Sequence, residues 1–210
     1  RYGSDDELLL AVGDGNHSLA SAKGVWEQEK AAGADPETHP GRYALVEIVN
    51  LYDPALTIEP IHRILFGADA TRVWTTLEKL AGESWEEMGD SAAAIERARG
   101  AADAFCVVHR GGAAVFTAAG DDTALPQERV EAEIERLRQE DDRITIDYIH
   151  GTAELERIAD EEGGVGIVMP GLERELLFPR VVTSGPLPRK MFSMGESFEK
   201  RYYLEARRIR

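Results

Sequence analysis

Short apolar runs of the strand type alternate along this chain with segments whose apolar residues recur at helical spacing. The clearest helical segment is 127–140, where Val130, Ile134 and Leu137 form an apolar stripe among charged residues. The clearest strands are 104–108 and 113–118, which flank a turn with two adjacent glycines and so predict a hairpin. Interleaved helices and strands predict an α+β (mixed α/β) fold, with a central mixed sheet and helices packed on it.

The same patterns predict the remaining elements. We expect helices at 18–32, 68–80, 90–99, 152–160 and 172–177 and in the tail 196–210, and strands at 8–12, 42–51, 144–148 and 164–169. Asp90 or Ser91 is the expected N-cap of its helix. Within 57–66, Pro60 excludes a regular helix interior, and the apolar residues after it indicate a short helical turn.

Length and charge narrow the possible functions. The 210 residues are enough for one α/β domain or for two packed subdomains of approximately 1–100 and 101–210. A net charge of −15 argues against nucleic acid or an anionic membrane as a partner, but allows a small anionic ligand in a local pocket.

The sequence shows neither a stretch long enough to cross a membrane nor a signal peptide. The single cysteine, Cys106, fits a cytoplasmic protein and lies in an apolar run that predicts a buried strand. Because the chain starts with Arg1, we expect it to be the C-terminal portion of a longer protein.

The motif richest in candidate ligand-binding and catalytic residues lies between a predicted strand and a predicted helix. It consists of Gly13, Asp14, Gly15, Asn16, His17 and Ser18. Glycines allow a tight turn and close approach to a ligand, and the N-terminus of the following helix favours an anion. Asp14 could hold a metal ion or act as a base, while Asn16 and His17 could donate to phosphate oxygens. The alternative is an Asp-Gly turn with an Asn or Ser helix cap and no ligand. The motif is neither a Walker loop nor a dinucleotide fingerprint.

Other candidate residues lie further along the chain. His62 and Arg63 could bind an anion or could be structural. His150 stands at another strand-to-helix junction and would share one sheet edge with Asp14 and His17 if their strands were parallel neighbours. No pair among the three histidines has the short spacing of zinc ligands. Adjacent cations, Arg189 and Lys190, could hold a phosphate or could pair with acidic helices.

Several of these segments together resemble an uncharacterised bacterial family, the domain of unknown function numbered ten-fifteen (DUF1015). The segments are 13–23, 42–50, 59–63, 177–179, 187–190 and 192–195, and the resemblance extends over essentially the whole chain. Members of this family usually carry a further N-terminal region of comparable size, so the resemblance implies a missing N-terminal part. The family name implies no activity.

A local resemblance links the Asp-Gly-Asn-His segment to ParB-like, sulfiredoxin-like and free-serine-kinase proteins, which carry a nucleotide-binding turn before a helix. Asp14 and Gly15 match the Asp-Gly form of that turn, and His17 matches the histidine of the sulfiredoxin-like form. Ser18 stands where those families place an arginine. Asn16 stands where the kinases have histidine and the sulfiredoxins have their catalytic cysteine, which argues against peroxiredoxin repair.

The favoured hypothesis is a nucleotide- or phosphate-binding enzyme of the phosphotransferase kind, with Mg²⁺ accompanying the nucleotide. Asp14 would hold Mg²⁺ or act as base, Gly15–Ser18 would cradle phosphate, and His62, Arg63, Arg189 and Lys190 would offset its charge. A non-catalytic module that binds a small ligand or a partner is the alternative. A DNA-associated protein is a third hypothesis, and the net charge argues against it.

Overall fold

The structure, a computed structural model, describes residues 10–13, 18–81, 85–101, 103–110, 112–118 and 124–195. By their contacts these residues form two units, which divide between Asp53 and Pro54. Each unit is described by itself below.

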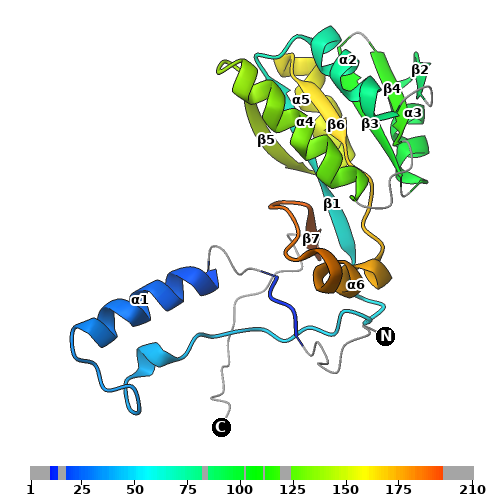
Figure 1. The fold of residues 1–210 in the computed structure, drawn as a ribbon. Helices are drawn as coiled ribbons and strands as arrows, with labels where there is room; N and C mark the ends of the chain where they lie inside the picture. The colour runs from blue at the N-terminus through cyan, green and yellow to red at the C-terminus, as the bar shows by residue number, and fades with distance from the viewer. Residues whose placement is uncertain are drawn as a thin grey trace. The chain divides into compact units, whose positions relative to one another are not determined.

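The second unit is built on one sheet (Figure 1). Its strands are β1 (Ile58–Phe66), β2 (Trp85–Met88), β3 (Ala104–His109), β4 (Gly112–Thr117), β5 (Thr145–His150), β6 (Val165–Val168) and β7 (Phe192–Met194). The strand order is β2-β4-β3-β6-β1-β5, and β7 pairs with the start of β1. The expected α+β class is confirmed, and all described strand pairs are antiparallel.

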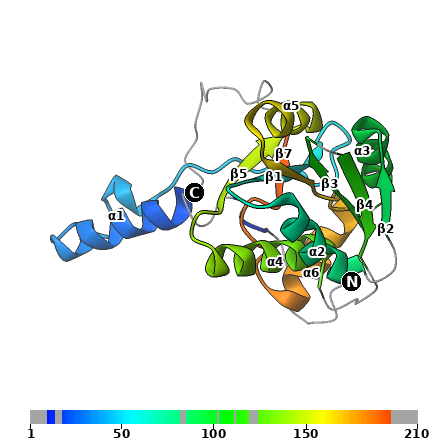
Figure 2. The same ribbon diagram turned by 90° about the horizontal axis from the view of Figure 1, so that it is seen from above.

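Helices cover both faces of this sheet, as the view from above shows (Figure 2). Helices α2 (Ala70–Ala81) and α4 (Pro126–Glu140) enclose one hydrophobic core, and α3 (Ser91–Arg99) and α5 (Thr152–Glu162) enclose the other. Successive side chains of a strand point to opposite faces. Leu65 of β1 therefore joins the core under α2 and α4, while its neighbour Ile64 joins the core under α3 and α5. Cys106 of β3 is buried in the second of these cores, as expected.

Helix α6 (Arg174–Ser184) and β7 complete the second unit beyond the main sheet. Strand β7 pairs with Ile58–Pro60, the part of β1 that precedes its pairing with β5 and β6. The Arg174 guanidinium donates to the carbonyl oxygen of Leu56, which ties α6 to the segment entering β1.

The first unit contains α1 (Ala20–Ala31), the short 3₁₀ helix η2 (Pro40–Arg42) and a segment without regular structure. Trp26 of α1 stacks on His39 with ring centroids 5.8 Å apart, and the His39 ring accepts a hydrogen bond from the Gly41 amide at 3.1 Å. Helix α1 has no buried residue. These contacts join α1 to η2 locally.

Two of the expected strands are wrong in the described residues. Segment 42–51 was expected to be a central strand, but 43–50 has no strand assignment, and its large apolar side chains are exposed. Its β-branched and aromatic residues favour a half-buried strand, but no described segment pairs with 43–50. Residues 10–12 of the expected strand 8–12 likewise have no strand assignment, and residues 8 and 9 lie outside the described residues.

The expected short helical turn after Pro60 is also wrong, because 58–66 is the continuous strand β1. Pro60 lies opposite Phe192 of β7, before β1 begins to pair with β5 at Ile61. A proline near the start of a strand removes one amide donor without breaking the later ladder. The expected hairpin and the helices at 18–32, 68–80, 90–99, 127–140 and 152–160 are confirmed, with boundaries within two residues of those expected. The helix expected at 172–177 is also present, but it starts at Arg174 and extends to Ser184. The expected tail helix 196–210 lies outside the described residues. No helix in the described part of the chain is both long enough and apolar enough to cross a membrane.

Candidate functional site

The structure describes only the two ends of the glycine-rich motif. Gly13 lies in a bend and Ser18 is exposed, whereas Asp14, Gly15, Asn16 and His17 lie outside the described residues. Helix α1 begins two residues after Ser18, so a helix does follow the motif. Its N-cap position belongs to Leu19, which makes no side-chain cap. Ser18 and Leu19 are themselves helical, since they form a π-helical turn that continues into α1.

His62 lies in the centre of β1 and is only 3% exposed. Its Nδ1 accepts a hydrogen bond from the Met169 amide at 3.1 Å. Burial, followed by the positive charges of Arg63 and Arg99 and by His150, lowers the pKa of His62 to about 4. The ring is therefore neutral at physiological pH, and with Nδ1 acting as acceptor the proton is on Nε2. His62 can donate a hydrogen bond, but it does not supply positive charge to a ligand.

Arg63, the next residue, is 1% exposed and points to the opposite face of the sheet. Its Nε donates to the Glu131 carboxylate at 2.9 Å, and another guanidinium nitrogen donates to the Ile61 carbonyl oxygen. The guanidinium also lies 5.1 Å from the ring centroid of Tyr148. These contacts compensate its charge within the protein.

His150 is the last residue of β5 and lies opposite Ile61 of β1. Gly151 follows with a φ of 79°, and α5 starts at Thr152, so the predicted strand-to-helix junction is present. His150 itself is exposed. The further expectation that parallel neighbouring strands would bring Asp14, His17 and His150 to one sheet edge has no basis here, because the described strand pairs are antiparallel.

Arg189 and Lys190 form an exposed turn between α6 and β7, and Lys190 has a left-handed φ of 57°. The carbonyl oxygen of the next residue, Met191, accepts a hydrogen bond from the Ile61 amide at 3.4 Å. His150 and the residue that follows this turn thus both adjoin Ile61 of β1, the residue directly before His62. Exposed cationic and imidazole side chains such as these can bind a small anion.

Two charged residues that act on His62 and Arg63, namely Arg99 and Glu131, are not among the residues predicted from the sequence. Arg99 at the end of α3 adds positive charge near His62, and Glu131 of α4 compensates Arg63. Glu131 lies at the edge of the buried stripe of α4, among other charged residues, so its sequence position gave no signal. No local pattern pointed to Arg99, whose proximity depends on the packing of α3. Within the described ranges, no three His, Cys, Asp or Glu side chains come together as a metal site.

The family of proteins of unknown function DUF1015 matches residues 5–141, which include the glycine-rich motif and β1. The chain belongs to the DUF1015 family. The expected resemblance is therefore confirmed over residues 5–141, and segments 177–179, 187–190 and 192–195 lie beyond the match. No curated protein sequence matches the chain.

Solved structures with a similar fold include nucleotide complexes of a kinase. A free serine kinase in complex with AMP has a TM-score of 0.51 and 16% identity, covering 71% of this chain and 58% of that chain. A mutant of free serine kinase in complex with ADP has a TM-score of 0.53 and 18% identity, covering 88% of this chain and 66% of that one. A conserved hypothetical protein from Pyrococcus furiosus has a TM-score of 0.53 and 14% identity, and the match covers 86% of this chain and 84% of that chain. This DUF1015 chain thus spans less than two thirds of the first kinase, and at these identities the likeness shows a shared fold.

Proposed function

We propose that this DUF1015 chain binds a nucleotide at the Gly13–Ser18 turn and transfers a phosphoryl group to a small hydroxyl-bearing acceptor. The observation that carries the proposal is the fold shared with free serine kinase structures that hold AMP and ADP. It is supported by the position of the motif, which lies directly before α1 and inside the segment matched by the family. A helix N-terminus after a glycine-rich turn has backbone N–H groups suited to phosphate.

In this proposal each residue of the turn has a stated task. Gly13 and Gly15 allow the backbone to approach the phosphates, and Asn16, His17 and Ser18 donate hydrogen bonds. Mg²⁺, bound by phosphate oxygens and Asp14, would neutralise part of the charge that develops during transfer. In the second unit, His150, Arg189 and Lys190 are exposed side chains with the chemistry to hold an anion. His62 and Arg63, in contrast, are neutral and charge-compensated, respectively.

The transfer itself forms a bond between the acceptor oxygen and the terminal phosphorus and breaks the bond from that phosphorus to the bridging oxygen. The nucleotide leaves with one phosphate fewer. The hydroxyl proton passes to Asp14 where this carboxylate acts as the base, and to a water molecule where Asp14 instead holds Mg²⁺. Catalysis of this reaction consists mainly of positioning and charge neutralisation.

Isothermal titration calorimetry with ATP and with ADP, each with Mg²⁺, tests the proposed binding. We expect Asp14→Asn and His17→Ala to weaken binding at least about tenfold, because each removes a contact to the phosphates or the metal. Asp142→Asn is the matched control, because Asp142 lies in an exposed turn of the second unit. Nucleotide affinity unchanged in both turn variants would refute the proposal. Nucleotide binding without formation of any phosphorylated product would instead favour the non-catalytic binding module.

A further inference from the structure

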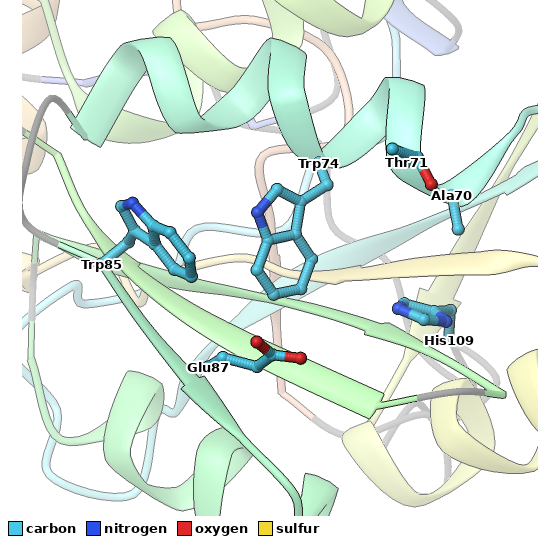
Figure 3. A pocket seen from close by; sticks show the side chains of 6 residues that line it. All are labelled: Ala70, Thr71, Trp74, Trp85, Glu87 and His109. Carbon is cyan, nitrogen blue, oxygen red and sulfur yellow. The ribbon is translucent and has the colours of Figure 1, made fainter.

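A hollow lies in the second unit between α2, β2 and the end of β3, and none of its lining residues belongs to the candidate site described above. It has a volume of about 270 Å³ and is lined by Ala70, Thr71, Trp74, Trp85, Glu87 and His109. Figure 3 shows the two indoles, the Glu87 carboxylate beneath Trp74 and the His109 ring on the other side of the opening. The hollow is open to solvent and is large enough for a small ligand.

The aromatic walls are held in place by the core. The rings of Trp74 and Trp85 stand nearly perpendicular, at 87°, with centroids 5.4 Å apart. Trp74 also contacts the buried Phe116 edge to face at 5.4 Å, and Trp85 stacks on the same ring at 6.2 Å. The His109 ring lies 6.5 Å from Trp74. Because these contacts fix the rings before any ligand arrives, little conformational entropy would be lost on binding.

The two adjacent glutamates of β2 have different surroundings. Glu86 forms an ion pair with Arg97 of α3 at 2.5 Å. Glu87 points to the opposite face, beside the indoles, and has no ion pair or hydrogen bond with any described residue. The hollow therefore combines an uncompensated carboxylate with two indole rings.

Among the described residues, the two arginines on elements beside the hollow have other partners. Arg72 of α2 reaches Glu140 at 2.8 Å, and the Arg110 Nε donates to the Asp160 carbonyl oxygen at 3.0 Å. The N-terminus of α2, whose dipole would repel a cation, is covered by Asp69, which accepts from the Arg72 amide at 3.0 Å. The carboxylates of Glu87 and Asp69 therefore disfavour phosphate and other anions at the hollow.

We propose that this hollow binds a small molecule carrying a methylated ammonium group. Aromatic faces attract such a cation through their quadrupole, and one carboxylate balances its charge. Indole rings offer no acceptors, so the N–H groups of an unmethylated ammonium would depend on Glu87, Thr71 and His109 alone, and any N–H facing the rings would lose its hydrogen bond to water. N-methyl groups need no acceptors and can contact the rings directly. This inference concerns a site separate from the proposed nucleotide turn and does not depend on it.

Titration of the intact chain with tetramethylammonium, followed by tryptophan fluorescence, tests the proposal. Saturable quenching is expected, with affinity at least about tenfold higher than for methylammonium and for tert-butanol, a neutral compound with the same number of heavy atoms. Absence of saturation, or equal affinity for either comparison compound, would overturn the proposal. These ligand comparisons use the unmodified protein and do not depend on the folding of any variant.

Two isosteric variants locate the binding on β2. Glu87→Gln is expected to weaken tetramethylammonium binding about tenfold, because it removes the balancing charge and keeps the shape. Glu86→Gln is the matched control, because Glu86 lies on the same strand, faces α3 and should leave the affinity unchanged. An equal loss in both variants, or no loss in Glu87→Gln, would show that the hollow is not the site.

Discussion

His62 is surrounded by groups that oppose its protonation. The side chain is buried, and the charges of Arg63 and Arg99 act in the same direction, so the pKa of the ring falls to about 4 from an ordinary value of 6.5. Between these two values the unfolded chain binds a proton that the folded chain does not bind. The free energy of unfolding must therefore fall as the pH drops from 6.5 towards 4.

We expect His62 to cost the protein about 2 kcal/mol of stability between pH 7.5 and pH 5. The measurement is urea unfolding of the wild type and of His62→Gln across this range. Carboxylates that begin to protonate are common to both proteins, so their effect cancels in the difference. The difference should shift in favour of the variant as the pH falls. Two parallel pH profiles would show that His62 does not titrate between the folded and unfolded states as described.

The neighbouring residue shows what a sequence can and cannot reveal about a site. The pair His62 and Arg63 was readable as a candidate anion site, because both residue types bind anions. Only the fold shows that the two side chains face opposite cores, and that Arg63 is paired with Glu131, 68 positions along the chain. Pairing over such a separation depends on how α4 packs on the sheet, which no local pattern encodes.

At the scale of elements, the spacing of apolar residues predicted helices and strands correctly where the packing of the fold agreed with the local preference for helix or strand. Helix α4 was predictable because Val130, Ile134 and Leu137 form one stripe, and that stripe is buried. Strand β2 was missed because its sequence, Trp-Glu-Glu-Met, has little apolar character, and it is held by pairing with β4. The β-type segment 43–50 was misassigned for the opposite reason. Its residues favour a strand, but strands form only where a partner supplies the ladder.

Two glycines directly follow regular elements with a left-handed φ, and only one of them has a close neighbour. Comparing them distinguishes the cost of backbone strain from the cost of steric overlap. Gly67 follows β1 with a φ of 72°, and Gly163 follows α5 with a φ of 77°. A Cβ at Gly67 would lie 2.4 Å from the Arg143 carbonyl oxygen, whereas a Cβ at Gly163 would meet nothing within 4 Å. Alanine at either position must adopt the left-handed region, which costs about 1–2 kcal/mol.

We therefore expect Gly163→Ala to lower the free energy of unfolding by about 1 kcal/mol and Gly67→Ala by about 3 kcal/mol or more. The extra loss arises because the neighbour at Gly67 is backbone, which cannot rotate away as a side chain can. Chemical denaturation of both variants beside the wild type measures the difference. Equal losses would mean that the turn after β1 relaxes without cost.

At the scale of the whole molecule, the buried apolar residues are concentrated in one unit. Both hydrophobic clusters are formed by residues between Ile64 and Met169, on the two faces of one sheet. The described part of the first unit has a helix without buried residues and an exposed apolar segment. Burial of apolar surface is the main favourable contribution to folding. The stability of the described chain must therefore reside mainly in the unit that begins at Pro54.

A chain that starts at Pro54 should accordingly unfold in urea as one cooperative transition, with a midpoint close to that of the full chain. Leu77→Ala, made in both lengths, provides the matched comparison, because Leu77 is fully buried between α2 and the sheet. It should lower the free energy of unfolding by about 2–5 kcal/mol, and by the same amount within about 0.5 kcal/mol in the two lengths. Cooperativity lost in the shorter chain, or a smaller effect of Leu77→Ala there, would mean that residues before Pro54 support this core. The result would decide whether the sheet and the four helices that cover it fold independently of the glycine-rich motif, and hence whether the proposed nucleotide turn can be removed without disturbing the hollow at Trp74.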